Sequence, residues 1–207
     1  MATIAENIVQ TLAANGIQRI WGVPGDSLNA VTEAIRREKD IEWMLTRHEE
    51  EAAFAAAGEA ALTGELAVCA GSCGPGNMHL INGLYDAHRS RVPVLAIAAH
   101  IPTEEIGSQY FQETRPTDLF RDCAVFCETV LSPEQMPRLL EIAMRTAIEK
   151  QGVAVLVITG DTASQDAVSD RVPEVRRSSP VTVPSPAELQ EAADTLNSCG
   201  NVTILAG

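Results

Sequence analysis

The chain has 207 residues, of which 45% are hydrophobic, and it carries a formal net charge of −13 at pH 7. Its acidic residues are dispersed rather than gathered in a tail, which argues against nucleic acid or an anionic membrane surface as a partner. A domain of ~150 residues buries roughly 70% of its unfolded surface, so its core needs neither disulfides nor a structural metal.

Helices and strands are predicted to alternate from the first residues. Thr3 and Glu6 have the spacing of a capping box, and the apolar stripe that follows them predicts a first helix. Residues 17–23 and 41–45 have the pattern of strands, and Ser27 is placed to cap the helix between them.

The same alternation continues to residue 159. The further predicted elements are a helix at 49–63, a strand at 66–70, a helix ending near 89, a strand at 92–99, a long loop over 100–115, a strand at 124–131, a helix at 133–150 and a strand at 153–159. Strands that alternate with helices imply an α/β fold, here a doubly wound six-stranded parallel sheet with helices on both faces.

The composition changes after this first domain, which we place at residues 1–160. Residues 161–185 are rich in Ser, Pro, Asp and Val and have the character of a linker. An amphipathic helix at 186–198 and a strand at 201–207 follow, and a helix with one strand cannot bury a core. We therefore expect residues 186–207 to open a second α/β domain, and the chain to be a truncated part of a longer protein.

Five cysteines are present, and the chain begins without the basic and apolar segments of a signal peptide. We therefore expect reduced thiols in a cytoplasmic protein. The cysteines include two Cys-x3-Cys pairs, but Cys69 falls in an apolar, strand-like run and Cys73 in the loop after it, which argues against zinc. We predict no metal site in this chain. No apolar stretch approaches the ~20 residues of a membrane span.

Ligands of an open parallel sheet bind at the carboxyl ends of its strands, and four predicted loops at that edge are unusual. They contain Pro24-Gly25-Asp26-Ser27, Arg47-His48-Glu49-Glu50-Glu51, Gly71-Ser72-Cys73-Gly74-Pro75-Gly76-Asn77-Met78-His79 and Tyr110-Phe111-Gln112-Glu113. Turn chemistry alone explains one or two such loops. Four that converge on one edge indicate a site.

Each of these elements also has a purely structural interpretation. Acidic residues in a first helical turn, such as Glu49, usually complement the helix dipole. The glycine loop lacks the Gly-Lys-Ser/Thr of a P-loop, so a tight strand-to-helix turn explains it equally well. His79, between apolar residues of a helix, has the pattern of a core histidine, and Phe111 that of a loop anchor.

Taken together, the motifs identify a family. Pro-Gly-Asp-Ser, Arg-His-Glu-Glu-x-Ala-x-Phe-Ala-Ala, Gly-Pro-Gly-x-x-His-Leu-x-Asn-Gly-Leu-Tyr-Asp-Ala and Phe-Gln-Glu resemble the amino-terminal pyrimidine-binding domain of thiamine-diphosphate enzymes. The likeness runs from about residue 4 to 160. Among these enzymes it is strongest to pyruvate oxidase and pyruvate:quinone dehydrogenase, because His79 stands where acetolactate synthases usually carry Asn.

The resemblance implies a role for particular residues. The family activates its cofactor with one glutamate that hydrogen-bonds N1′ of the aminopyrimidine and directly follows the His of an Arg-His-Glu triplet, which here is Glu49. It also implies that Pro24, Gly25, Ser72 and Pro75 lie against the aminopyrimidine, and that Asp26, Ser27, His79, Phe111 and Gln112 border the substrate.

The implied function is the oxidative decarboxylation of pyruvate to acetate and CO2 by thiamine diphosphate and FAD, with a quinone or oxygen as electron acceptor. Magnesium and diphosphate are held in this family by a Gly-Asp-Gly motif, which this chain lacks. Residues 186–207 would then open a central domain of FAD-binding type. The fragment alone would be inactive, since the cofactor lies between domains of two subunits.

Two alternatives remain open. The chain can belong to acetolactate synthase or another 2-oxo acid decarboxylase, or it can be a non-catalytic, stand-alone α/β binding module. For the oxidase, the resemblance implies a homo-oligomer, either a dimer or a tetramer. It also implies a cytoplasmic enzyme, peripheral to the inner membrane in its full-length form, that reaches membrane quinone only through a carboxyl-terminal part absent here.

Overall fold

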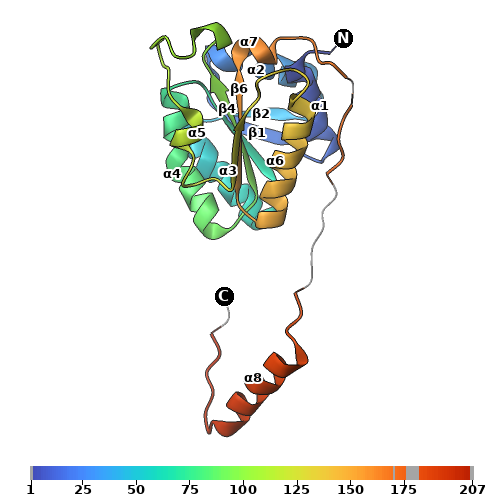
Figure 1. The fold of residues 1–207 in the computed structure, drawn as a ribbon, viewed down its shortest axis with the longest axis vertical. Helices are drawn as coiled ribbons and strands as arrows, with labels where there is room; N and C mark the ends of the chain where they lie inside the picture. The colour runs from blue at the N-terminus through green and yellow to red at the C-terminus, as the bar shows by residue number, and fades with distance from the viewer. Residues whose placement is uncertain (1, 170, 176–181, 206–207) are drawn as a thin grey trace. The chain divides into compact units, whose positions relative to one another are not determined.

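The structure is a computed structural model that describes residues 2–169, 171–175 and 182–205. The chain divides into two compact units, residues 1–177 and 178–207 (Figure 1). The first unit is built on a six-stranded, all-parallel sheet in the order β2-β1-β3-β4-β6-β5. This confirms the predicted α/β fold with six parallel strands.

The strands are short at the edges of the sheet and longest in its centre. They are β1 (Arg19–Gly22), β2 (Glu42–Leu45), β3 (Ala67–Gly71), β4 (Val94–His100), β5 (Phe126–Thr129) and β6 (Val153–Thr159). The helices of this unit are α1 (Ile4–Ala14), α2 (Asn29–Arg37), α3 (Glu49–Thr63), α4 (Pro75–Ser90), α5 (Pro116–Leu119), α6 (Met136–Lys150) and α7 (Gly160–Ala163). Two 3-10 turns, η1 (Asp26–Leu28) and η2 (Thr103–Glu105), complete it.

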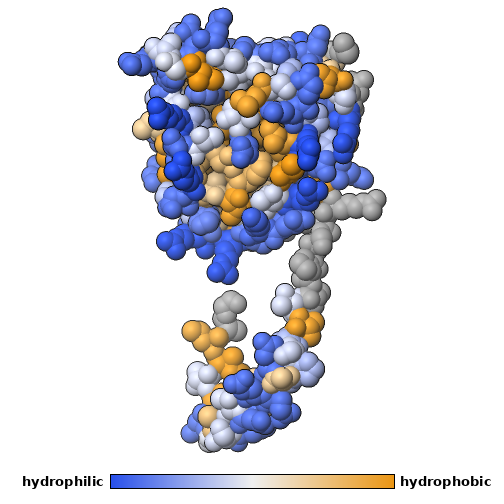
Figure 2. Space-filling model, in the orientation of Figure 1, coloured by the Kyte–Doolittle hydropathy of each residue, from blue (hydrophilic) through white to orange (hydrophobic). Residues whose placement is uncertain are grey.

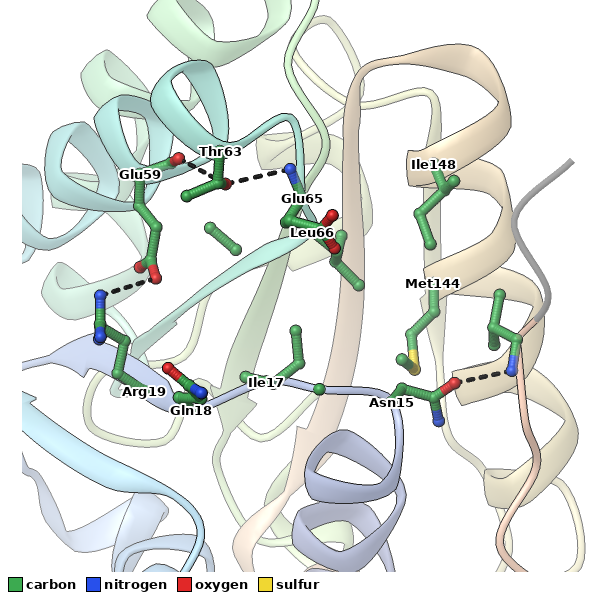
Figure 3. Close-up of a pocket in the computed structure, with 13 residues that line it drawn as sticks. Asn15, Ile17, Gln18, Arg19, Glu59, Thr63, Glu65, Leu66, Met144 and Ile148 are labelled. Carbon is green, nitrogen blue, oxygen red and sulfur yellow. Dashed lines mark hydrogen bonds and ion pairs between the residues drawn. The ribbon is translucent and has the colours of Figure 1, made fainter. Parts of the chain in front are cut away.

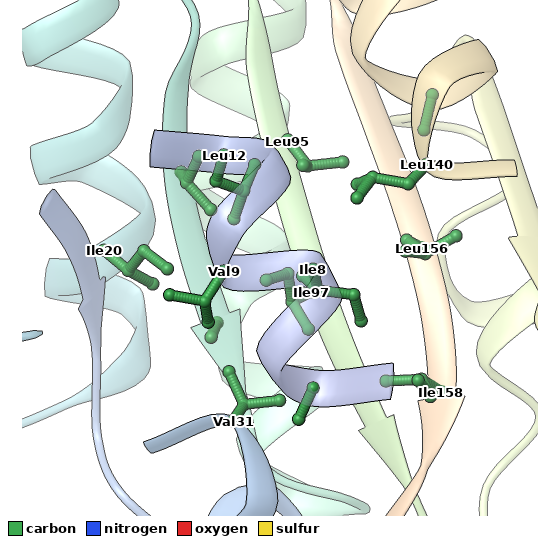
Figure 4. Packing of buried hydrophobic residues seen from close by; sticks show 14 of the residues in the cluster. Ile8, Val9, Leu12, Ile20, Val31, Leu95, Ile97, Leu140, Leu156 and Ile158 are labelled. Carbon is green, nitrogen blue, oxygen red and sulfur yellow. The ribbon is translucent and has the colours of Figure 1, made fainter. Parts of the chain in front are cut away.

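The central strands are buried on both faces, and their side chains alternate between two apolar clusters. In β4, Leu95 and Ile97 face the cluster under α1, α2 and α6, while Val94 and Ala96 face the cluster under α3 and α4. Figure 4 shows the first cluster, in which α1 lies across β4 and β6. Each fully buried aliphatic side chain of this kind stabilises the fold by about 1.5–3 kcal/mol.

The predicted cap of the second helix is wrong. Helix α2 begins at Asn29, its N-cap is Leu28, and no side chain caps it. Ser27 lies instead in the 3-10 turn η1, where its hydroxyl bonds to the loop after β3. The hydroxyl is therefore not available to the helix, because the neighbouring loop engages it.

The segment predicted as a linker begins with structure that belongs to the first unit. Its first residues complete α7, which Thr159 caps by accepting a hydrogen bond from the backbone N–H of Thr162. Further along, the side chain of Asn15 donates to the carbonyl of Pro173 and accepts from the N–H of Val175. The chain therefore remains attached to the first unit as far as residue 175.

Helix α5 was also not predicted from the sequence.

The second unit contains α8 (Pro186–Ser198), whose capping box joins Ser185 and Glu188. None of residues 182–205 is buried. The predicted strand at 201–207 is wrong for residues 201–205, which form no strand, and its last two residues lie outside the described part. A strand needs a hydrogen-bonding neighbour, and none of the residues described in this unit supplies one.

No helix in the described part of the chain is long and apolar enough to cross a membrane. Figure 2 shows an apolar area within a hydrophilic border on the visible face of the first unit. Large apolar side chains that are exposed on α3 and α4 include Phe54, Met78 and Tyr85. These three side chains add exposed apolar surface to the two helices.

Helices α3 and α4 approach each other closely because small side chains line their contact. A Cβ atom on Gly83 would stand 2.5 Å from Cβ of Ala53 and 2.6 Å from the backbone nitrogen of Phe54. Gly58 is also interior to a helix, α3, but a Cβ atom there would meet nothing within 4 Å. Of these two helical glycines, only Gly83 is required by packing.

We predict that Gly83→Ala lowers the free energy of unfolding by roughly 1–3 kcal/mol, because the added methyl group forces the backbones of α3 and α4 apart. Gly58→Ala is the matched control and is expected to raise it by roughly 0.5–1 kcal/mol, since alanine is the better helix former. Urea unfolding of the two variants measures both changes in the free energy of unfolding. Equal effects of the two substitutions would contradict the helix contact described here.

Candidate active site

A cavity of about 460 Å³ lies at the carboxyl edge of the sheet, where the loops after β1, β2, β3 and β4 meet. We call it the carboxyl-edge cavity. It is lined by Pro24, Gly25, Asp26, Ser27, His48, Glu49, Ser72, Cys73, Pro75, Gly76, His79, Phe111 and Gln112. All ten residues that the family resemblance selects are therefore brought together. His48, Cys73 and Gly76 were not selected, although each lies inside one of the quoted motifs.

Glu49 is the one member of its acidic run that lines the cavity. Its side chain is 13% exposed, and Oε2 lies 3.1 Å from Nδ1 of His79. Glu50 instead accepts a hydrogen bond from the side chain of Asn82, and Glu51 accepts one from the backbone N–H of Arg47. The three adjacent carboxylates thus have three different partners, and the core-histidine interpretation of His79 is wrong.

Glycine leaves the backbone bare beside this carboxylate. A Cβ atom on Gly76 would stand 3.2 Å from Oε1 of Glu49, so any side chain there would fill the space in front of that oxygen. Gly74, which precedes helix α4, has a φ of +63°, a conformation that residues with a Cβ adopt rarely. The glycine loop therefore serves two purposes, a tight turn and close access to Glu49.

The loops after β1 and β3 are fastened to each other by hydroxyl groups. Oγ of Ser27 lies 2.9 Å from Oγ of Ser72, and it accepts a hydrogen bond of 2.9 Å from the backbone N–H of Cys73. A Cβ atom on Gly25 would stand 2.4 Å from Oγ of Ser72. This contact fixes the position of the first loop against the third.

The loop after β4 forms the wall that carries Phe111 and Gln112. The carboxylate of Glu113 accepts hydrogen bonds from the backbone N–H groups of Gly107 and Gln109, at 2.6 and 2.7 Å, and these bonds lower its pKa. Gln112 has a φ of +64°, and its side-chain oxygen lies 3.4 Å from Sγ of Cys73. Phe111 is 78% exposed, so this wall of the cavity faces solvent.

A second cavity of about 360 Å³ adjoins the first, since both are lined by Asp26, Ser27, Cys73, Phe111 and Gln112. It extends to His100, the last residue of β4, which is 5% exposed. Nδ1 of His100 has no hydrogen-bond partner among the described residues. Burial lowers the pKa of His100, although the negative charge of Glu113 opposes this effect.

The ligand atoms of His48, Glu49 and His79 lie within 4.8 Å of one another, a spacing that could hold a metal ion. The hydrogen bonds favour a different interpretation. Nδ1 of His48 accepts the backbone N–H of Glu50, and Nδ1 of His79 is bonded to Glu49. Because a metal would have to replace one of these bonds or bind a nitrogen that carries a proton, the trio is better described as a hydrogen-bonded group.

A third cavity, of about 400 Å³, lies near the amino ends of β1 and β3 (Figure 3). We call it the amino-edge cavity. Arg19 and Glu59 form an ion pair on its wall, at 3.1 Å. It contains none of the residues that the sequence predicts for the site, and it lies at the edge of the sheet opposite to where α/β proteins bind their ligands.

Comparison with known proteins identifies the family of the chain. Residues 2–119 match the thiamine pyrophosphate (thiamine diphosphate) enzyme family, in its N-terminal TPP binding domain. The chain is 56% identical over 208 residues to a 42.6 kDa protein of the isoamylase 3′ region of Pseudomonas amyloderamosa, covering 99% of this chain and 52% of that protein.

Two further relatives have named activities. A pyruvate oxidase of Lactiplantibacillus plantarum is 40% identical over 155 residues, covering 74% of this chain and 26% of that protein. The acetolactate synthase isozyme 2 large subunit of Escherichia coli is 36% identical over 153 residues, covering 74% of this chain and 28% of that protein.

The fold, the cavity and these matches define an α/β cofactor-binding domain. The chain belongs to the thiamine pyrophosphate enzyme family, and the matched part is its N-terminal TPP-binding domain. It spans about half the length of the first relative, at 52%, and about a quarter of the other two, at 26% and 28%.

We predict that His100 makes the fold sensitive to mild acid. Its folded-state pKa lies below the ordinary value of 6.5, so the unfolded chain binds the proton first, and stability falls as pH falls through 6.5. The slope from one proton is at most about 1.4 kcal/mol per pH unit. His100→Gln should flatten the fall in unfolding free energy between pH 7 and 5.5, measured by urea unfolding. An unchanged slope would contradict the burial of this imidazole.

Proposed function

We propose that this chain supplies the activating half of the cofactor site of a pyruvate oxidase or pyruvate:quinone dehydrogenase, with Glu49 as the activating carboxylate. The observation that carries the proposal is the placement of Glu49. Its side chain is 13% exposed, and a Cβ on Gly76 would stand only 3.2 Å from its Oε1. A carboxyl group held in a partly desolvated cavity can share a proton with a ring nitrogen.

The residues present fit the aminopyrimidine of thiamine diphosphate. When bound, this cofactor supplies the electron sink that decarboxylation of a 2-oxo acid requires. Glu49 would hold the proton at the ring nitrogen N1′. Gly25, Ser72 and Pro75, with Pro24, would form the surfaces along the ring, and the bare backbone at Gly76 would let the ring approach the carboxylate.

The substrate would lie toward the more open part of the cavity. Asp26, Ser27, His79, Phe111 and Gln112 line that cavity and would border the reacting carbon of pyruvate. His79 can donate a hydrogen bond to Glu49 and still offer its second ring nitrogen, Nε2, for hydrogen bonding to a small polar substrate. Phe111 would border the carbon that reacts from the wall that faces solvent.

Acetolactate synthase is the second candidate, because relatives of that name align with 74% of this chain. The residue that favours the oxidase is His79, which takes the place of the Asn usual in acetolactate synthases. A non-catalytic binding module is a third hypothesis. It requires no role for Glu49, whereas the structure contains a cavity into which this carboxylate faces.

The other parts of the proposed enzyme would lie outside this chain. Diphosphate, Mg²⁺ and FAD would be held by further domains and by a second subunit, in a cytoplasmic homo-oligomer that reaches a membrane quinone through its carboxyl-terminal part. The exposed apolar side chains of α3 and α4 support the proposal of such a partner surface.

We predict that Glu49→Gln, made in the native protein with any further domains it carries, slows cofactor activation by roughly a hundredfold to ten-thousandfold. The amide cannot exchange a proton with N1′. The measurement is the exchange of the thiazolium C2 proton with deuterated solvent, followed by proton NMR, together with the release of CO2 from pyruvate.

Glu50→Gln is the matched control for this variant. Its amide oxygen can still accept the hydrogen bond from Asn82, so exchange and turnover should stay within a few-fold of the native values. Near-normal exchange in Glu49→Gln would overturn the assignment of the activating carboxylate. Acetolactate as the main product from pyruvate would support the second candidate instead.

A further inference from the structure

His48 lies beside Glu49 and contributes a ring to the carboxyl-edge cavity. It is the N-cap residue of α3, and its Nδ1 accepts a hydrogen bond of 3.2 Å from the backbone N–H of Glu50. A nitrogen that accepts cannot also carry a proton. The bond therefore favours the neutral imidazole with its proton on Nε2.

One carboxylate acts against this preference. Oε2 of Glu50 stands 3.9 Å from Nδ1 of His48 and would favour a protonated ring. That distance is too long for a hydrogen bond, and the other oxygen of Glu50 is engaged by Asn82. The backbone N–H is the closer partner, so the neutral form of His48 is the one that the local geometry favours.

The rings of His48 and His79 are stacked. Their centroids lie 4.3 Å apart, and their planes meet at 29°. His48 caps α3 and His79 lies in α4, and the side chain of His79 is 45% exposed, so its orientation depends on the stack with His48 and on the hydrogen bond to Glu49.

The orientation of His79 fixes which of its nitrogens carries the proton. Nδ1 lies 3.1 Å from Oε2 of Glu49, and an ionised carboxylate can only accept a hydrogen bond. Nδ1 is therefore the donor, and the neutral ring of His79 keeps Nε2 as its free acceptor. Without the stack, the exposed ring could turn and lose this arrangement.

We propose that His48 is a positioning residue, which uses its capped and stacked ring to hold His79 with Nδ1–H on Glu49 and Nε2 available to the substrate. The catalytic consequence rests on the proposed function of Glu49 and His79. The tautomers themselves do not, because they follow from contacts within this chain.

Two substitutions separate the contacts that His48 makes. His48→Asn keeps a side-chain acceptor suited to an N-cap but removes the ring. His48→Phe keeps a ring that can stack but removes the acceptor. If the stack positions His79, the Asn variant loses the orientation of His79 but retains the helix cap. The Phe variant retains the orientation of His79 but loses the helix cap.

The test is a long-range proton–nitrogen NMR correlation on the uniformly labelled chain, which contains four histidines. In the native chain we expect the Nε2–H tautomer for His48 and the Nδ1–H tautomer for His79. In His48→Asn, the two nitrogens of His79 should move toward averaged tautomers without a change in the urea midpoint. In His48→Phe, His79 should keep its tautomer while the urea midpoint falls.

His88→Asn is the control, since His88 lies in the last turn of α4 and does not line the cavity. It should leave the signals of His79 unchanged. An Nε2–H tautomer for His79 in the native chain would overturn the proposal, as would an Nδ1–H tautomer that persists in His48→Asn.

In the complete enzyme, His48→Asn should also lower kcat by roughly ten- to a hundredfold, because a misplaced group in an active site costs about that much. His48→Phe should recover most of this loss. If the tautomers are as expected but Glu49→Gln keeps full activity, the positioning of His79 stands and the proposed function fails. If the tautomers differ and Glu49→Gln is inactive, the positioning of His79 fails and the proposed function stands.

Discussion

The close contact between α3 and α4 is the interaction on which the site depends. Gly83 lets the two helices approach so closely that a Cβ atom there would stand 2.6 Å from the backbone nitrogen of Phe54 and 2.7 Å from the carbonyl carbon of Ala53. Glu49 precedes Ala53 by four residues, and His79 precedes Gly83 by four. One helical turn separates each pair, so the spacing set at Gly83 and Ala53 brings Glu49 and His79 to 3.1 Å at the carboxyl edge.

The sheet fixes the other boundaries of the site. All six strands are parallel, so the loops that follow them lie at one edge. Hydrogen bonds then fasten these loops to each other, through Ser27 and Ser72 on one side and through Cys73 and Gln112 on the other. The arrangement of backbone turns and short polar contacts holds Glu49 in place without a salt bridge to Lys or Arg among the described residues.

The sequence predicted the fold because helices with an apolar stripe alternate with short apolar runs that are typical of buried parallel strands. It predicted that the loops after four consecutive strands converge on one edge, and the family resemblance then selected ten residues, all of which line the carboxyl-edge cavity. It missed the cap of α2, since the hydroxyl of Ser27 is engaged by a loop distant in sequence. It also treated residues 173–175 as linker, although Asn15, at the end of α1, holds the backbone of Pro173 and Val175. Such tertiary hydrogen bonds have no local pattern.

The sequence also did not predict the structural roles of His48 and His79. The apolar neighbours of His79 suggested a core position, but only Leu80 is buried, whereas Met78 is exposed and the imidazole is 45% exposed beside Glu49. Nothing in the spacing of residues 48 and 79 predicts that their rings stack. The contact arises because the start of α3 and the second turn of α4 meet at the carboxyl edge of the sheet.

The central claim is that the aminopyrimidine of the cofactor binds at the carboxyl edge and meets Glu49. The most direct measurement is an NMR titration of this chain with the hydroxymethylpyrimidine half of thiamine, following the backbone amides and the side-chain carboxyl carbons. We expect shifts at Gly25, Ser72, Gly76 and the carboxyl carbon of Glu49. Shifts confined to the amino-edge cavity, at Arg19 and Glu59, with none at Glu49, would contradict it.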